Sequence, residues 1–175
     1  MSESNIEFAW VGNDVAVIRL EGRGNFENSI ELQRITDYLR KHKSGVKLII
    51  DMDQCTTMDS TFMGTIAGIS TDQNKAGAGY VTVVNTHKHT DHLLRNLGLS
   101  YILDIREQSN DLGVHEKDFQ KVAPQDKVSK FEQIVHMIKA HEKLIDIDNE
   151  NEVRFQSVLK YLEQSLDREK EKKEP

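Results

Sequence analysis

IIDMDQCTTMDSTFMG, residues 49–64, is the stretch on which the predicted fold and function depend. An apolar run ends in an acidic loop, and the loop ends at Asp59-Ser60-Thr61, where a helical pattern begins. A short apolar run of this kind is typical of a buried parallel strand. A hydroxyl at the start of a helix, with carboxylates around it, lies where a phosphate would change the surface sharply. The stretch therefore indicates a regulatory protein rather than an enzyme.

Strand-like and helical patterns alternate on both sides of this stretch. Two β-rich segments separated by Gly12-Asn13-Asp14 predict a hairpin, and Asn28 or Ser29 is placed to cap the helix that follows. The predicted elements are strands at 6–10 and 15–20, a helix at 30–39, a strand at 46–50, a helix at 60–75, a strand at 80–84, a helix at 91–97 and a strand at 101–105. This order predicts an α/β layer built from crossover connections.

The composition changes after Arg106. Residues 107–124 are polar and have no hydrophobic periodicity, whereas residues 128–166 contain two amphipathic patterns separated by Asp148-Asn149. These patterns predict an antiparallel helical hairpin. We therefore expect a domain at 1–108, a linker at 109–124 and a C-terminal helical extension at 125–175. The apolar face of the extension fits packing on the first domain, docking of a partner or formation of a homodimer, and the sequence leaves these alternatives open.

Charge and composition exclude several classes of protein. The 175 residues include 23 Lys and Arg against 29 Asp and Glu, for a net charge of −6, so a nucleic-acid binder is not expected. The single cysteine, Cys55, fits a reducing compartment. The N-terminus has no signal-peptide pattern, and no apolar run approaches the roughly 20 residues that cross a bilayer. We expect a cytoplasmic protein without membrane contact.

Residues 6–106 resemble the STAS domain of anti-sigma factor antagonists. Three sets of residues carry the resemblance. Leu20–Asn25 is similar to the family's turn after the second strand, and Ile49–Asp51 with Met58–Thr61 is similar to its third strand and phosphorylation loop. Val83–Asn85 with Leu93–Leu99 is similar to its fourth strand and third helix. The resemblance implies a mixed sheet with helices packed on it.

The resemblance also implies a function without enzymatic activity or cofactor. In this family a partner kinase of the histidine-kinase-like ATPase fold, often itself an anti-sigma factor, phosphorylates the serine after the aspartate, and a serine phosphatase reverses the modification. Carried over, Ser60 is the phosphoacceptor, and phosphorylation switches partner binding off. The expected partner-binding residues are Gly24, Asn25, Asp59, Thr61, Phe62 and Met63. Phe62 fits either a docking anchor or a core position. The alternative is a STAS binding module that works without phosphorylation.

A second motif indicates a different chemistry. Thr86–His92 reads T-H-x-H-x-D-H, which resembles the metal-binding signature of the metallo-β-lactamase superfamily. His87, His89, Asp91 and His92 would be the ligands of a metal-dependent hydrolase. Too little chain follows for the sandwich fold of that superfamily, and His136 and His141 lie in a helical pattern. We therefore expect an exposed polar loop here and keep the hydrolase as the weakest alternative.

Overall fold

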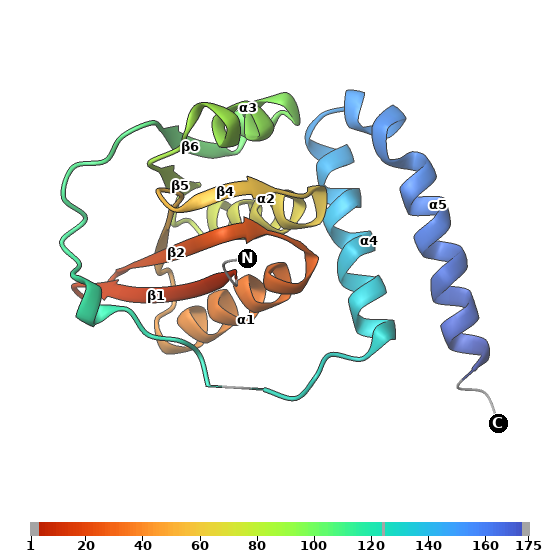
Figure 1. The fold of residues 1–175 in the computed structure, drawn as a ribbon, viewed down its shortest axis with the longest axis horizontal. Coiled ribbons are helices and arrows are strands. Elements are labelled where there is room, and N and C mark those ends of the chain that lie inside the picture. The colour runs from red at the N-terminus through yellow and green to blue at the C-terminus, as the bar shows by residue number, and fades with distance from the viewer. Residues whose placement is uncertain (1–3, 124, 173–175) are drawn as a thin grey trace.

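The computed structural model describes residues 4–123 and 125–172 (Figure 1). Strands and helices alternate through the first part, and two long helices end the chain. The elements are β1 (Asn5–Val11), β2 (Val15–Gly24), α1 (Phe26–His42), β3 (Lys47–Asp51), β4 (Cys55–Met58), α2 (Ser60–Lys75), β5 (Val81–Val84), α3 (Lys88–Asn96), the 3₁₀ turn η1 (Leu99–Tyr101), β6 (Leu103–Arg106), the 3₁₀ turn η2 (Glu116–Asp118), α4 (Lys130–Ile147) and α5 (Glu150–Glu171).

The strands form one mixed sheet in the order β1-β2-β3-β5-β6. β1 and β2 form the predicted antiparallel hairpin, and the pairs β2–β3, β3–β5 and β5–β6 are parallel. The hairpin turn contains Gly12 at φ 59°, a left-handed conformation that glycine adopts without strain. The predicted mixed sheet with packed helices is confirmed.

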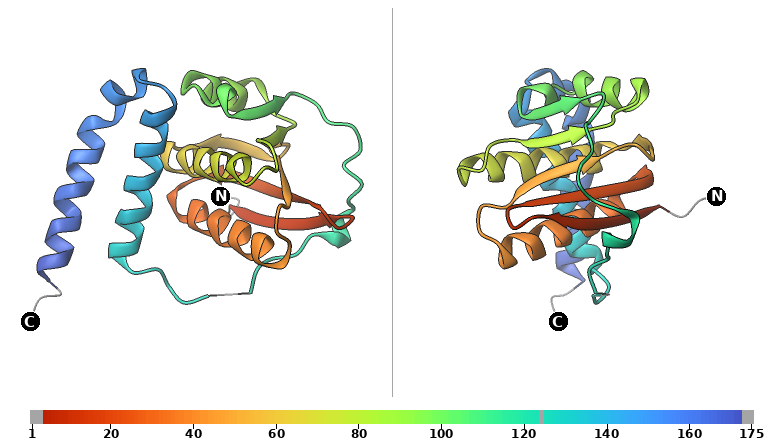
Figure 2. Two further views of the ribbon diagram at one scale, coloured as in Figure 1. Left: turned by 180° about the vertical axis from the view of Figure 1, so that it is seen from behind. Right: turned by 90° about the vertical axis from the view of Figure 1, so that its left-hand side faces the viewer.

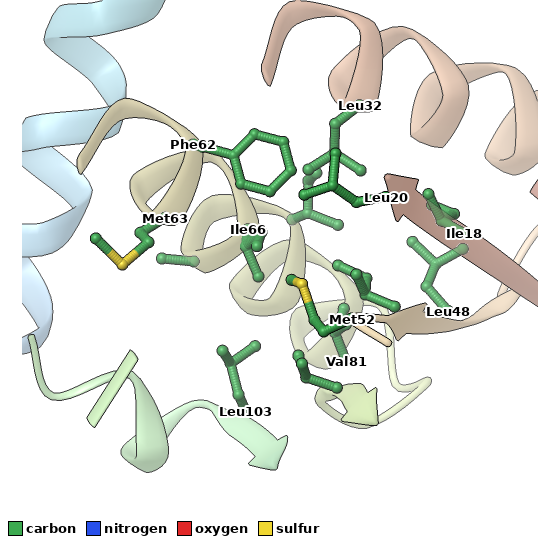
Figure 3. Close-up of a cluster of buried hydrophobic side chains, with 14 of the residues drawn as sticks. Ile18, Leu20, Leu32, Leu48, Met52, Phe62, Met63, Ile66, Val81 and Leu103 are labelled. Atoms are coloured by element: carbon green, nitrogen blue, oxygen red, sulfur yellow. The ribbon is translucent and has the colours of Figure 1, made fainter. Parts of the chain in front are cut away.

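Helices α1 and α2 contact each other and cover one face of the sheet, which is clearest from behind (Figure 2). Their buried faces meet side chains from every strand of the main sheet. Phe62 and Ile66 of α2, both fully buried, lie in the same core as Leu20 of β2 and Leu32 of α1 (Figure 3). This apolar layer fixes the position and the rotation of α2, and with them the direction in which its first residue points.

The start of α1 differs from the expected one. Its N-cap is Asn25, not Asn28 or Ser29: the Asn25 Oδ1 accepts from the backbone N–H groups of Glu27 and Asn28 at 3.0 and 3.1 Å. The Asn28 Oδ1 accepts in turn from the Asn25 N–H at 2.8 Å, which completes a capping box. Asn28 and Ser29 are buried inside the first turns of the helix. Three capping residues lie close together here, and the sequence alone does not show which one precedes the helix.

The loop between β3 and α2 contains a short strand that the sequence pattern did not predict. β4 pairs in parallel with the end of β2, where Gly24 lies opposite Met58. Four residues with only two buried side chains give too weak a hydrophobic pattern to predict a strand. β4 nevertheless determines the geometry of the site, because it places the start of α2 directly beside the turn that follows β2.

The C-terminal helices form the expected antiparallel hairpin. Residues 107–123 and 125–129 lead to it around the opposite side of the sheet, and α4 then lies against α2 with α5 outermost (Figure 1). The connecting segment contains η2 and an isolated bridge between Phe8 and Gln120. In the part of the chain that the structure describes, no helix is both long enough and apolar enough to cross a membrane.

Candidate functional site

The turn after β2 and the first turn of α2 form one continuous piece of surface. The Asp59 N–H donates to the Gly24 carbonyl at 2.8 Å, so the loop before α2 is bonded to the end of β2. A Cβ on Gly24 would overlap the ring of Phe62, which means that only glycine allows this approach. The two loops that the family resemblance singled out therefore meet in space.

Ser60 is the first residue of α2, as predicted, and Asp59 is the N-cap. The Asp59 Oδ1 accepts from the Phe62 N–H at 2.8 Å, which satisfies one of the amides that has no partner within the helix. The N–H groups of a first turn carry a partial positive charge and favour an anion. The hydroxyl of Ser60 is thus held at a position suited to a phosphate.

The Ser60 side chain is half-buried and has a partner from the C-terminal hairpin. Its Oγ lies 2.9 Å from Nε2 of His141, a buried residue of α4. The other ring nitrogen, Nδ1, lies 2.7 Å from the Met137 carbonyl, which can only accept, so Nδ1 carries a proton. In the neutral ring Nε2 is then the acceptor, and Ser60 donates its hydroxyl proton to it. The sequence pattern placed His141 on an amphipathic helix but did not connect it to Ser60.

The remaining residues predicted to bind a partner divide into two groups. Asn25 and Asp59 are half-buried caps at the edge of the site. Thr61 and Met63 are almost fully buried, and Phe62 is completely buried, with its ring directed toward Leu20 and Leu32 (Figure 3). Of the two roles open to Phe62, the structure gives the core position. In this conformation the buried residues hold α2 in place and offer little surface to a partner.

The two carboxylates upstream of Ser60, those of Asp51 and Asp53, lie in different environments. Asp51 is buried at the end of β3, and its Oδ1 accepts from the Asn85 side chain at 2.8 Å and from the Asp53 N–H at 3.1 Å. Asn85 adopts φ 59°, which places its amide under the β3–β4 loop. Asp53 is exposed. Asp51 therefore acts as a structural residue of this loop, and Asp53 and Asp59 supply its accessible negative charge.

Cys55 is a buried residue of β4 near the site. Its Sγ contacts the Thr57 carbonyl at 3.5 Å, and burial raises the pKa of its thiol to about 11. A thiol with so high a pKa is almost entirely protonated at neutral pH and reacts slowly. Cys55 is therefore a packing residue of the site.

The side chains of the histidine motif are not grouped as metal ligands in the part of the chain that the structure describes. The His87 Nε2 lies 2.5 Å from the Asp53 carbonyl and the His89 Nε2 lies 3.1 Å from the Thr57 hydroxyl, while Asp91 pairs with Arg95 one turn along α3. Three of the four candidate ligands thus have partners of their own, and none of these contacts joins two of the candidates. Within residues 4–123 and 125–172, no group of three or more His, Cys, Asp or Glu side chains could hold a metal ion. The hydrolase alternative has no support from this geometry, because the candidate ligands of the motif are not grouped around a common point.

The family model of the STAS domain matches residues 10–112, which is more than half of the chain. The protein therefore belongs to the STAS-domain family, which confirms the resemblance seen in the sequence. The matched residues include both loops of the site and all six strands, apart from the start of β1, and they end before the helical hairpin.

Solved structures give the same fold at low sequence identity. The NMR structure of the protein TM1081 is 16% identical over 62% of this chain and 85% of its own, with a TM-score of 0.50. The crystal structure of TM1081, a candidate anti-sigma factor antagonist from Thermotoga maritima, is 18% identical over 58% and 85%, with a TM-score of 0.49. The anti-sigma factor antagonist SpoIIAA in its unphosphorylated form is 17% identical over 58% and 86%, with a TM-score of 0.48. No curated protein matches the chain.

Proposed function

We propose that this protein is an anti-sigma factor antagonist-type regulator whose partner binding is switched off by phosphorylation of Ser60. The partner would be a protein serine kinase of the histidine-kinase-like ATPase fold that also acts as an anti-sigma factor, and a serine phosphatase would restore the free hydroxyl. The observation that carries the proposal is the position of Ser60, first in α2 behind the Asp59 cap and beside the Gly24 turn.

The chemistry of that position supports a switch. The kinase would transfer the γ-phosphoryl group of ATP to the Ser60 Oγ, so that ADP leaves and the hydroxyl proton is released. The new phosphate adds about −1.5 to −2 charges beside Asp59 and Asp53. The start of α2 favours an anion, so the domain itself need not unfold. A partner surface matched to a bare hydroxyl would instead meet repulsion of several kcal/mol, and each 1.4 kcal/mol changes affinity about tenfold.

The surface available for docking is narrower than the sequence predicted. Asn25, Asp59 and Ser60 are the candidate contact residues, since each keeps part of its side chain at the surface. Thr61, Phe62 and Met63 would contribute by holding α2 in position. Gly24 would contribute through its backbone and through the close approach to Phe62 that it permits.

Intact-mass measurement of the full chain from its native host, followed by peptide mapping of residues 48–75, tests the proposal. We expect one phosphate on Ser60 under some growth or stress conditions and none in a Ser60→Ala variant. Thr56→Ala is the matched control, because Thr56 is an exposed hydroxyl in the adjoining strand. The control should keep its phosphate.

A chain that stays unmodified across growth and stress conditions would contradict the phosphoswitch. The same surface would then be assigned to a STAS binding module that captures its partner constitutively. The two functions also differ in their response to charge, because Ser60→Asp should abolish partner capture by the switch and affect the constitutive module less.

A further inference from the structure

The C-terminal hairpin covers the end of the STAS domain that carries Ser60 (Figure 1). The closest approach joins Gly64 of α2 to the backbone of Ala140 in α4, where a Cβ on Gly64 would overlap the Ala140 carbonyl group. One turn earlier on α2, Ser60 meets His141 at 2.9 Å. The residue proposed to receive phosphate therefore lies beneath α4.

Polar side chains form part of this contact, beside the buried apolar side chains of Ile134, Ala140 and Leu144. His136 Nε2 lies 2.8 Å from the Ser29 hydroxyl of α1 and 3.1 Å from the Thr65 hydroxyl of α2. Both hydroxyl protons are already donated to helix carbonyls, those of Phe26 and Thr61, so His136 must be the donor. Imidazole–hydroxyl contacts of this kind can exchange for contacts with water. Interfaces with a large polar share are typical of parts that separate and dock again.

The close backbone approach of α4 to α2 at Gly64 does not continue to the next turn of α2. Gly68 lies one turn beyond Gly64, and a Cβ placed there would meet nothing within 4 Å. From this point α4 diverges, leaving a groove of about 670 Å³ bordered by α1, α2 and α4. In residues 107–123 and 125–129, the described parts of the linker that leads into α4, the 3₁₀ turn η2 is the only helix or named strand. Release of the Ser60 end of α4 therefore requires Leu144, which lies in the hydrophobic core cluster, to stay packed while the rest of α4 moves, so that the sheet and its helices stay in place.

We propose that α4 is a tethered lid on Ser60, which a kinase or another partner must displace to reach the switch surface. The inference rests on the proposed function of Ser60 and adds a layer of regulation to it. A lid that is closed most of the time lowers the apparent affinity of any partner by the fraction of open molecules. Phosphorylation would also oppose closure, because it removes the hydroxyl proton that Ser60 donates to His141 and places a phosphate where the two side chains now lie 2.9 Å apart.

Thiol labelling of the full chain tests the lid without any partner. Ser60→Cys places a reporter under α4, and N-ethylmaleimide is the probe. Gly64→Ala should push α4 away while improving the intrinsic helix propensity of α2. Gly68→Ala is the matched control, with the same gain in propensity and no neighbour to displace. We expect Gly64→Ala to raise the labelling rate of Cys at position 60 about tenfold, and Gly68→Ala to leave it unchanged.

Two measurements keep this result interpretable. Cys55 reports global unfolding, since its buried thiol should stay unlabelled in every variant that remains folded. Hydrogen exchange should show faster exchange in α4 of the Gly64→Ala variant, with β1 and β2 still protected. Equal labelling rates in Ser60→Cys alone, with Gly64→Ala and with Gly68→Ala would contradict the lid proposal. Equal acceleration by both glycine substitutions would contradict it as well.

Measurement of the phosphate on Ser60 in the native host distinguishes a failure of this inference from a failure of the proposed function. With Ser60 restored, the Gly64→Ala chain should carry more phosphate than the Gly68→Ala chain. Equal, non-zero phosphate occupancy of Ser60 in these two chains would contradict the proposal that α4 regulates access to Ser60. Absence of phosphate from every chain, together with rapid labelling of the Gly64→Ala reporter, would overturn the role of Ser60 and leave the displaceable contact of α4 standing.

Discussion

At the scale of single residues, His136 is a half-buried titratable side chain at the contact of α4 with α1 and α2. Burial lowers the pKa of its imidazole below the usual value of 6.5, and the charge of Lys139 on the same helix lowers it further. Asp37 of α1 and Asp72 of α2 border the adjoining groove. The unfolded chain therefore binds a proton at position 136 more readily than the folded chain does. The resulting stability is fully present above pH 6.5 and is lost as the pH falls toward the folded-state pKa.

We predict that replacing His136 by Gln reduces the loss of stability on acidification. Gln keeps an N–H donor for Ser29 and Thr65 but cannot take up a proton. Urea unfolding from about pH 8 to about pH 5.5 should show a shallower decline for His136→Gln than for the natural chain. Identical pH profiles for the two chains would mean that this imidazole does not titrate differently in the folded state.

At the scale of elements, the corner of the hairpin is held to the STAS domain by Asn151 at the start of α5. This side chain is fully buried, and its Nδ2 donates to the carbonyls of Leu97 and Leu144 at 2.9 and 2.8 Å. The Asn151 side-chain amide of α5 is thus hydrogen-bonded both to α4 and to the residue that follows α3. The corner is a fixed point about which the rest of α4 could open.

We predict that Asn151→Ala lowers the free energy of unfolding by about 2 kcal/mol, because the Leu97 carbonyl loses this buried donor and the Leu144 carbonyl is left with the Asp148 N–H at 3.3 Å. The matched control is Asn149→Ala, since Asn149 is exposed and its side chain makes no capping bond. Urea denaturation should place the control within about 0.5 kcal/mol of the natural chain. Comparable losses in the two variants would show that the corner bonds are not what holds the hairpin.

At the scale of the whole molecule, the chain consists of a STAS domain and a hairpin that the family model does not match. α4 packs between the domain and α5, so α5 contacts α4 with one face and leaves another face to solvent. Val153 and Tyr161 on α5 are 77% and 63% exposed. Of the roles that the sequence left open for the hairpin, packing on the domain is now observed for α4, and a homodimer stays a prediction for α5.

We predict a dimer that forms through α5 as the protein concentration rises. Burying exposed apolar side chains against a second copy provides the favourable free energy. Sedimentation velocity over a range of concentrations should show the dimer, and combined Val153→Lys and Tyr161→Lys substitutions should abolish it. A single monomeric species at every concentration would contradict the prediction.

The sequence alone determined the class of fold, the order of the main elements, the β1–β2 hairpin, the C-terminal helical hairpin and the position of Ser60 at the start of α2. These features depend on local patterns: apolar runs, helical periodicity and capping residues within a few positions of one another. Asn25 was missed as the cap because three capping residues lie close together in the sequence, and β4 was missed because it depends on pairing with the end of β2. The burial of Phe62 was left open because it depends on contacts with other elements.

Only the tertiary structure brought His141 to Ser60, across 81 positions of sequence. Local patterns account for each residue separately: Ser60 begins a helix, and His141 belongs to an amphipathic helix. Neither pattern therefore predicts contact with the other residue. Their contact depends on the route of the linker, on the absence of a side chain at Gly64 and on the angle at which α4 crosses α2. Local patterns specify elements, whereas the packing of distant elements decides which functional groups meet.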